Sequence, residues 1–476
     1  MTIEPMTKIP DHVFRGYDLR GLVGNELNED TVAQLAKGYG TWLLKRRVYD
    51  CVIGYDSRES SPLFRDVFVK NLTETGVTVY DIGMTLTQIA YFAQYHFLTR
   101  GMVMITASHN PKEYNGFKFA TGFSATMESE EVIAFRELVK SKKFITREPV
   151  GRHIQKVIFP TYMDDLFRKT GNIKKFKVVV DSCAATTGLF LPAILRKAGC
   201  VVVEQNTKPD PNFPVGVADP TEKEVQERLA RRVIREKADL GFSYDTDGDR
   251  IGVVDDKGGL IWNDVLVSLF SKDILDFLPG AKIIYNALCS KQVSEVIQKS
   301  GGQGIMWKVG HSFIKAKARE EAAAFGGELS GHFFFLDNFY GHDDGAIASL
   351  RLLAYLTRIG KSLRQAVAEL PQYVSSPEIK VGCPDNIKFD VVSKKIGGEI
   401  KKLYPRAKYV EIDGVRMDTK EEMLIVRASQ NGPYLTVKFE GKSKTAYDKL
   451  KEQINKILHQ FKEVDFKSGV NTTALD

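Results

Sequence analysis

The stretch DLGFSYDTDGDRIGVVD, residues 239–255, places an acidic loop between two short apolar runs. The runs Asp239–Tyr244 and Ile251–Asp255 have the apolar, β-rich composition of buried strands. Between them stand three carboxylates at alternate positions, those of Asp245, Asp247 and Asp249. Carboxylates held this close repel one another unless a cation neutralises them. The stretch therefore predicts a strand, a cation-binding loop and a second strand.

The rival interpretations of this loop are a calcium-binding EF-hand and a solvated acidic turn. An EF-hand loop needs glycine at its sixth position and a helix on each side. The sixth residue here is Arg250, and both flanks are strand-like. Carboxylate oxygens suit Mg²⁺ or Mn²⁺ better than Zn²⁺. The acidic turn is the alternative that stays open.

Further strand-like runs alternate with amphipathic stretches on both sides of this unit, which indicates an α/β fold with largely buried sheets. The expected strands are 51–56, 77–82, 102–106, 177–181, 201–204, 282–285, 304–308 and 333–336, and the expected helices are 61–75, 87–98 and 129–140. A length of 476 residues favours three or four domains.

The sequence after residue 370 has a different pattern. Two expected strands, Met423–Val426 and Leu435–Phe439, flank a turn. A final helix carries an apolar stripe that predicts packing against the last sheet. The stripe consists of Tyr447, Leu450, Ile454, Ile457 and Phe461. We expect four domains, at residues 1–155, 156–258, 259–370 and 371–476.

The composition argues against several classes of protein. The 67 Lys and Arg and the 60 Asp and Glu are spread along the chain, so the net charge of +7 predicts no nucleic-acid partner. The chain has no run of about eighteen apolar residues and no signal-peptide pattern, which predicts no membrane partner. Five scattered cysteines without a CxxC pair argue against disulfides and zinc. We expect a cytoplasmic protein.

A second loop, TASHNP at residues 106–111, directly follows an expected strand. Because Pro111 prevents a regular strand from continuing, Ser108 is expected at a sharp bend at the carboxyl end of the sheet, where α/β proteins bind ligands. Ten residues later, Lys118 is a candidate for proton transfer. A Ser-His pair alone is weak evidence, because a turn with a hydrogen-bonded histidine has the same pattern.

Two more loops carry groups suited to sugars and phosphates. GGELSGH, residues 326–332, has side chains that hydrogen-bond to sugar hydroxyls, and a flexible turn is the alternative. VRASQNG, residues 426–432, combines a guanidinium, a hydroxyl and amides that suit phosphate, and a plain hairpin turn is the alternative. Neither a GxGxxG nor a GxxxxGK[ST] motif is present, so bound ATP and hydride transfer have no support.

Together, in this order and spacing, the loops resemble the α-D-phosphohexomutase family, in particular its bacterial phosphomannomutase/phosphoglucomutase branch. YDLRG at residues 17–21 and GYDSR at residues 54–58 match two further family motifs, and the resemblance covers nearly the whole chain. It implies three mixed α/β domains and a smaller C-terminal domain, related to the TATA-binding protein, around a central cleft. It also implies interconversion of hexose 1-phosphate and hexose 6-phosphate through a phosphoserine and a 1,6-bisphosphate.

The resemblance assigns the chemistry to the first two loops. Ser108 would carry the phosphate, and one Mg²⁺ per chain would bind it together with Asp245, Asp247 and Asp249. Arg20 and Arg250 would spread the transition-state charge. Lys118 would assist proton movement, and His109 would shape the serine loop.

The resemblance assigns recognition to the other loops. The sugar-facing residues would be Tyr17, His311, Glu328 and Ser330, and the distal phosphate loop would consist of Arg427, Ser429, Gln430, Asn431 and Gly432. Phosphosugars are the implied partners, and hexose 1,6-bisphosphate is the implied activator. We expect a monomer or a weak homodimer.

Three features depart from the family pattern. The phosphate loop lacks the usual threonine, and Thr246 stands where glycine is frequent. Leu288 replaces a lysine that is common in close bacterial relatives. One cationic substrate contact is therefore lost or comes from elsewhere, for example from Lys291 or Lys315.

The choice of substrate is open. KEYNGFK, residues 112–118, resembles the hexose-phosphate mutases, whereas phosphoglucosamine mutases more often have Asn-Gly-Ile-Lys there. Mannose and glucose phosphates are the leading substrates, since these epimers differ by about one hydrogen bond, roughly 1 kcal/mol. Phosphoglucosamine mutase is the first alternative. A phosphohydrolase and a non-catalytic phosphosugar-binding protein are the other rivals, and the intact Ser108 and Lys118 argue against the last.

Overall fold

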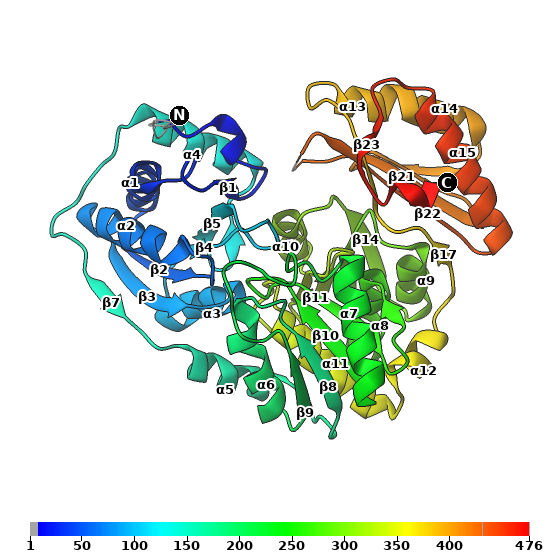
Figure 1. Ribbon diagram of the computed structural model, residues 1–476, viewed down its shortest axis with the longest axis horizontal. Coiled ribbons are helices and arrows are strands. Elements are labelled where there is room, and N and C mark those ends of the chain that lie inside the picture. The colour runs from blue at the N-terminus through cyan, green and yellow to red at the C-terminus, as the bar shows by residue number, and fades with distance from the viewer. Residues whose placement is uncertain (1–7, 431, 476) are drawn as a thin grey trace. The chain divides into compact units, whose positions relative to one another are not determined.

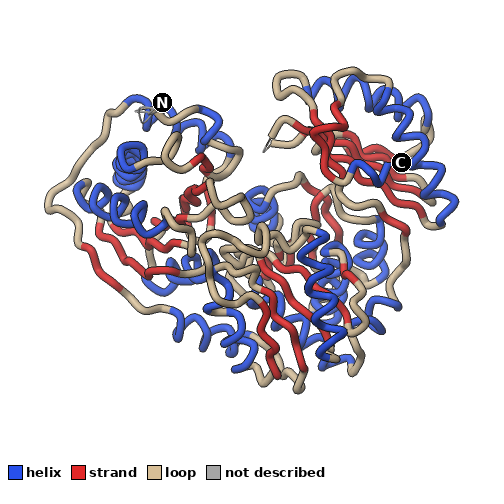
Figure 2. Tube along the Cα trace, in the orientation of Figure 1, coloured by secondary structure: helices blue, strands red, loops and turns tan. Residues whose placement is uncertain are grey.

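The computed structural model describes residues 8–430 and 432–475. Their contacts divide the chain into two compact units. The first unit comprises Met1–Asn263 and Ser330–Gln365, and the second comprises Asp264–Leu329 and Ala366–Asp476. Within each unit, helices pack against β-sheets (Figures 1 and 2).

The first sheet of the first unit is mixed, with the strand order β1-β5-β4-β2-β3-β7 and β6 added to β5. β2 is parallel to β3 and β4, whereas β5 runs antiparallel to β1 and β4. The strands are β1 (Leu19–Leu22), β2 (Asp50–Tyr55), β3 (Thr78–Met84), β4 (Gly101–Ile105), β5 (Tyr114–Gly122), β6 (Ala125–Thr126) and β7 (His153–Gln155). The helices are α1 (Glu29–Lys45), α2 (Ser61–Glu74), α3 (Thr87–Phe97) and α4 (Ser129–Ser141).

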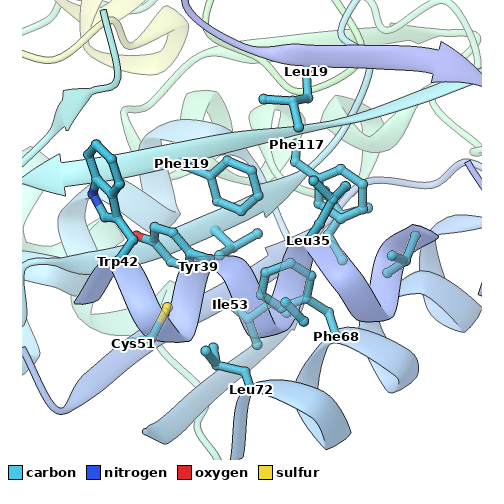
Figure 3. Close-up of a cluster of buried hydrophobic side chains, with 14 of the residues drawn as sticks. Leu19, Leu35, Tyr39, Trp42, Cys51, Ile53, Phe68, Leu72, Phe117 and Phe119 are labelled. Carbon is cyan, nitrogen blue, oxygen red and sulfur yellow. The ribbon is translucent and has the colours of Figure 1, made fainter. Parts of the chain in front are cut away.

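Helices α1, α2 and α4 pack on this sheet through an aromatic-rich core. Figure 3 shows the part of this core that α1, α2 and the strands form. Tyr39 of α1 lies against Phe119 of β5, with ring centroids 4.6 Å apart. The Tyr39 hydroxyl donates to the Ala120 carbonyl at 2.7 Å and accepts from the Met102 amide at 3.1 Å, so the buried phenol is satisfied. Val52 of β2 is fully buried outside this core, and α3 packs against β2 and β4. Both faces of the sheet are thus covered, which fixes the end of β4 where the serine loop begins.

The second sheet of this unit has the strand order β12-β11-β10-β8-β9. β8, β9 and β10 are parallel, and β11 returns antiparallel to β10. The strands are β8 (Lys177–Asp181), β9 (Val201–Gln205), β10 (Leu240–Tyr244), β11 (Ile251–Asp255) and β12 (Leu260–Ile261); the unit also contains β16 (Phe333–Phe335), α5 (Phe159–Lys169), α6 (Leu191–Lys197), α7 (Lys223–Glu236) and α11 (Gly345–Ile359). Every residue of β10 and β11 is buried, so both ends of the acidic loop are anchored.

The second unit begins with three parallel strands, in which β13 (Lys282–Asn286) lies between β14 (Gln303–Trp307) and β15 (Phe325–Gly327). The helices α8 (Asn263–Phe277), α9 (Lys291–Lys299) and α10 (His311–Glu320) pack against these strands. His311 therefore starts a helix that follows directly on β14.

The C-terminal sheet is antiparallel, with the strand order β19-β20-β21-β22-β18-β23 and β17 beside β22. The strands are β17 (Val374–Ser375), β18 (Ile379–Gly382), β19 (Lys408–Val410), β20 (Val415–Asp418), β21 (Glu422–Ala428), β22 (Tyr434–Gly441) and β23 (Asp465–Val470); the helices in this part of the chain are α12 (Leu363–Ala368), α13 (Lys388–Asp390), α14 (Gly397–Leu403) and α15 (Lys444–His459). Leu450, Ile454 and Ile457 of α15 share one core with Leu424 and Val437 of the sheet.

The predicted α/β fold is confirmed, and the ends of the expected strands and helices differ from the observed ends by at most two residues. Phe461 is a correction, because α15 ends at His459, but its ring still packs against the C-terminal core. All five cysteines are buried and free. Within the described residues, the model contains no helix with the length and apolar character needed to cross a membrane.

Candidate active site

The serine loop leaves the first sheet where β4 ends, at Ile105. The Ser108 amide donates to Thr106 Oγ1 at 2.9 Å, and Ser108 has a left-handed backbone with a φ of 49°. A residue with a side chain adopts this conformation at a cost of about 1–3 kcal/mol. The surrounding structure must therefore hold the turn in place.

Arg58, in the GYDSR motif, provides that restraint. Its buried guanidinium donates to three backbone carbonyl groups of the serine loop, to the carbonyl group of Tyr114 at the start of β5, and to one carboxylate. The acceptors are Ser108 O (2.7 Å), Asn110 O (2.7 Å), Pro111 O (2.8 Å), Tyr114 O (3.0 Å) and Asp56 Oδ2 (3.1 Å). These bonds use all three guanidinium nitrogens, so the shape of the loop depends on this side chain.

Replacing Arg58 by lysine should destabilise the protein by about 2–4 kcal/mol. An ammonium has three donors, and it cannot span acceptors that a planar guanidinium reaches together. Urea unfolding measures the loss, and turnover should fall with it because the serine turn loosens. Arg65→Lys is the matched control, since Arg65 is 20% exposed and its charge partners are Asp66 and Asp81. Equal stability of the two variants would contradict the role of Arg58.

The acidic loop lies beside Ser108, although 137 residues separate Ser108 from Asp245 in the sequence. Ser108 Oγ donates to Asp245 Oδ2 at 2.8 Å. β5 adds Lys118, whose Nζ donates to Asp247 Oδ2 at 2.6 Å and to Asp249 Oδ2 at 2.5 Å. The two sheets of the first unit thus bring together the predicted serine, lysine and carboxylates.

The three carboxylates fit a divalent cation. One oxygen atom from each lies within 4.8 Å of the other two. Asp247 Oδ1 and Asp249 Oδ1 are buried and have no hydrogen-bond partner among the described residues, although leaving a buried carboxylate oxygen unpaired is costly. A cation that prefers oxygen ligands, such as Mg²⁺ or Mn²⁺, would satisfy both atoms. The side chains therefore match the metal that the acidic loop predicts.

The charges of this cluster set its ionisation. Burial lowers the pKa of Lys118, but Asp247 and Asp249 outweigh burial and raise that pKa well above its ordinary value. Burial also opposes ionisation of Asp247, yet the Lys118 ammonium outweighs it and lowers the pKa of Asp247. Burial raises the pKa of Asp245 to about 8, and the charges of Asp249 and Asp247 add to the effect. A bound divalent cation would relieve this repulsion.

Arg250 connects the acidic loop to the serine. Its Nε donates to Asp245 Oδ2 at 3.0 Å, and its Nη2 lies 3.5 Å from Ser108 Oγ. Its Nη1 donates to Asp219 Oδ1 at 3.4 Å, a contact that the sequence did not reveal. His109 Nδ1 is 3.2 Å from Ser108 Oγ. Arg250 and His109 therefore both border the expected phosphate carrier.

Arg20 lies on β1, at the edge of the same cluster. Its guanidinium donates to Asp18 Oδ2 at 2.9 Å and to the Ala107 carbonyl at 3.3 Å, and it also bonds to Asn110 Oδ1. Tyr17 is half-buried, two residues before β1. The amino-terminal motif is thus attached to the serine loop through Arg20.

His332 and Asp343 extend the cluster beyond the predicted residues. His332 Nδ1 lies 3.0 Å from Asp343 Oδ2 and 3.8 Å from Asp249 Oδ1. Thr87 Oγ1 donates to Asp247 Oδ2 at 2.5 Å. A sequence signal existed only for His332, which ends the GGELSGH loop. Nothing in the spacing of Thr87 or Asp343 points to the acidic loop.

The predicted phosphate loop joins β21 to β22 in the second unit. Arg427 lies near the end of β21, and its Nε donates to Asp413 Oδ2 at 2.9 Å. Asp413 was not predicted, because its only sequence signal is a common Asp-Gly turn. The other predicted residues are Ser429, which is buried, Gln430 and Gly432, which are half-buried, and Asn431, which lies outside the described residues.

The predicted sugar residues of the second unit lie around one glycine. Glu328 follows β15, and its Oε1 accepts from the Gly310 amide at 2.8 Å and from Asn286 Nδ2 at 3.1 Å. His311 begins α10 directly after Gly310 and is buried. Glu328 and His311 are therefore neighbours. Ser330 is half-buried and belongs to the first unit.

Leu288 stands where the family pattern often has a lysine. Leu288 is buried, and its carbonyl accepts from Lys438 Nζ at 3.2 Å. Lys291 donates to both backbone carbonyl groups of the 419–420 turn. This engagement weakens the expectation that Lys291 replaces the missing lysine. Lys315, the other candidate, is 1% exposed.

Three family models match the chain in order. They are the phosphoglucomutase/phosphomannomutase alpha/beta/alpha domains I, II and III, over residues 11–145, 160–259 and 262–374. Together with the antiparallel sheet that follows, these matches confirm the predicted architecture of three α/β domains and a further C-terminal sheet domain.

Individual relatives agree with the family models. The chain is 33% identical over 444 residues to a phosphomannomutase/phosphoglucomutase of Pseudomonas putida, covering 93% of this chain and 95% of that protein. It is 33% identical over 457 residues to the protein of the same name from Pseudomonas aeruginosa, covering 96% and 97%. A solved phosphoglucomutase/phosphomannomutase family protein from Burkholderia thailandensis matches with a TM-score of 0.87 at 30% identity, covering 95% of this chain and 98% of that chain.

Proposed function

Because the chain belongs to the phosphoglucomutase/phosphomannomutase family, we propose that it interconverts hexose 1-phosphate and hexose 6-phosphate through a phosphorylated Ser108. The observation that carries the proposal is the contact of Ser108 Oγ with Asp245 inside a cluster of three carboxylates, a lysine and two arginines. Phosphoryl transfer depends mainly on positioning and on charge stabilisation. This cluster has the groups for both.

The reaction has two transfers of the same kind. A hydroxyl oxygen of a hexose monophosphate attacks the phosphorus on Ser108, the bond from phosphorus to Oγ breaks, and a hexose 1,6-bisphosphate forms. The other phosphate then returns to Ser108 Oγ in the reverse direction. Water takes no part, so inorganic phosphate is not released.

Each attacking hydroxyl must lose a proton. Lys118 donates to Asp247 and Asp249, so it supplies positive charge and hydrogen-bond donors beside the acidic loop. His332, whose Nδ1 lies 3.0 Å from Asp343 Oδ2, is the group suited to take up the proton. Arg250 and Arg20 supply fixed positive charge at Ser108, where negative charge develops.

Mg²⁺ would be held by the acidic loop, through Asp245, Asp247 and Asp249, together with Ser108 or its phosphate. When bound, it supplies positive charge to the phosphoryl oxygens. The fit rests on the buried Oδ1 atoms of Asp247 and Asp249, which have no hydrogen-bond partner in the part of the chain that the structure describes.

Recognition of the substrate falls largely to the second unit. Arg427 would bind the non-reacting phosphate, together with Ser429 and the backbone of 430–432. Contacts to the sugar would come from Glu328, His311, Ser330 and Tyr17. Hexose 1,6-bisphosphate would activate the enzyme by phosphorylating Ser108, and the protein would act as a cytoplasmic monomer or weak homodimer.

Mannose and glucose phosphates are the substrates that the relatives' names favour, and glucosamine phosphate is the alternative. Phosphorus NMR with Mg²⁺ and a trace of hexose 1,6-bisphosphate tests this choice, with mannose, glucose and glucosamine 1-phosphates supplied separately. Conversion of the first two to 6-phosphates without free phosphate is the expected result. Faster conversion of glucosamine 1-phosphate would identify the protein as a phosphoglucosamine mutase. Stoichiometric free phosphate would indicate a hydrolase, and no change would indicate a binding protein.

A further inference from the structure

Asp413 lies in the turn between β19 and β20, and a single oxygen atom of its side chain accepts two hydrogen bonds. Oδ2 accepts from Arg427 Nε at 2.9 Å and from the Val309 amide at 2.9 Å. The side chains of Asp413 and Arg427 are only 8% and 6% exposed. One carboxylate oxygen thus joins the phosphate loop to the segment that precedes His311.

The next amide along that segment is held by a second carboxylate. Gly310 N donates to Glu328 Oε1 at 2.8 Å. Gly310 has a φ of 136°, a conformation that residues with a side chain rarely adopt, so the turn needs a glycine at this position. Two consecutive peptide groups therefore connect Asp413 on one side to Glu328 on the other.

The geometry points to a positioning role for Asp413: we propose that it couples Arg427 to the Val309–Gly310 turn, and through this turn to Glu328. Through this coupling, the binding of the non-reacting phosphate and the binding of the sugar would depend on each other. The proposal rests on the proposed function, in which Arg427 binds phosphate and Glu328 binds the hexose.

The bonding of Arg427 explains why a carboxylate helps an anion site. Asp413 binds Nε of Arg427, so this carboxylate does not occupy the two terminal nitrogens of the guanidinium. A guanidinium fixed along one edge has less rotational freedom to lose when it binds a phosphate with its remaining donors. The benefit of this restraint opposes the repulsion between Asp413 and the bound phosphate, and the first test measures which effect is larger.

The first test is Asp413→Asn in the full-length enzyme, with steady-state kinetics on glucose 1-phosphate. We expect KM to rise about tenfold or more while kcat changes by less than about threefold, because the distal phosphate is held equally in the ground and transition states. Asp413→Glu, which keeps the charge, should recover part of the loss. An unchanged KM for Asp413→Asn would overturn the proposal.

Asp418→Asn is the matched control. Asp418 forms an ion pair with Arg416 on β20, the strand that follows Asp413, and both of its carboxylate oxygens accept from that arginine. This variant should lower the melting temperature without raising KM. An equal rise of KM in both variants would show a general structural effect and would overturn the positioning role.

A double-mutant cycle tests the coupling itself. Arg427→Lys and Glu328→Gln are combined in the native background and again with Asp413→Asn. We expect the effects on KM to depart from additivity by about threefold to tenfold in the native background and by less than about twofold without Asp413. The same departure from additivity in both backgrounds would contradict the coupling through Asp413.

The coupling through Asp413 and the proposed function can be tested separately. If the native enzyme shows no turnover, the proposed function is wrong. The role of Asp413 can still be tested, because calorimetry measures the binding of glucose 1-phosphate to the Ser108→Ala protein. There, Asp413→Asn should raise Kd about tenfold if Asp413 positions Arg427. An unchanged Kd would overturn the positioning role of Asp413 and would leave the proposed function untouched.

Discussion

Replacing Ser108 by alanine should lower kcat for glucose 1-phosphate by at least about 10⁴-fold. Removing a nucleophile typically costs this much or more, because the covalent route is lost while binding and electrostatics persist. The variant should fold normally, since the lost bond from Oγ to Asp245 contributes roughly 1 kcal/mol. A coupled assay of glucose 6-phosphate formation measures the effect, and circular dichroism confirms the fold.

Ser182→Ala is the control for this change. Ser182 is fully buried in the same unit, and its hydroxyl has no hydrogen-bond partner among the described residues. Its removal should leave turnover within about twofold of the native value, because no bond is lost. Normal turnover by Ser108→Ala would refute Ser108 as the phosphate carrier.

Asp247→Asn is expected to have the second largest effect, a loss of about 10³-fold in kcat. The substitution removes one charge from the acidic loop and one of the two carboxylates that hold Lys118. Cation affinity falls because an amide oxygen is a weaker ligand than a carboxylate. Titration of activity with Mg²⁺ after EDTA treatment separates weaker metal binding from a lower maximal rate.

Thermal unfolding gives an independent measure of the same site. A ligand bound only by the folded state stabilises it, by about 2.7 kcal/mol at a concentration of 100 times Kd. Mg²⁺ should therefore raise the melting temperature of the native protein and of Thr246→Ala, which removes a buried hydroxyl that has no partner among the described residues. The increase should be small for Asp247→Asn. Equal increases in all three proteins would place the cation elsewhere.

The parts of the site that the sequence predicted are those encoded locally. The acidic loop lies between two fully buried strands, and the serine loop ends at a proline that no strand continues through. The carboxylates at alternate positions predicted a cation-binding loop from the sequence alone. These local patterns predicted Ser108 and the acidic loop without knowledge of the contacts between them.

The residues that sequence analysis missed act through contacts between distant segments. Arg58 stands in the matched GYDSR motif, but its role was missed, because it binds backbone carbonyl groups of a loop about fifty residues away, and these groups are the same for every residue type. Asp219 is found only because Arg250 reaches it, and Asp413 only because Arg427 does. The domain limits near 155, 258 and 370 stay a prediction, and so do the roles of the individual substrate contacts.

The most direct test of the account is a single turnover of the phosphorylated enzyme. Ser108 is labelled with radioactive phosphate, free label is removed, and excess glucose 1-phosphate is added with Mg²⁺. The account predicts that the label moves to hexose 1,6-bisphosphate and then to glucose 6-phosphate, with none as inorganic phosphate. Label that stays on the protein while unlabelled glucose 6-phosphate forms, or that appears as inorganic phosphate, would contradict the account.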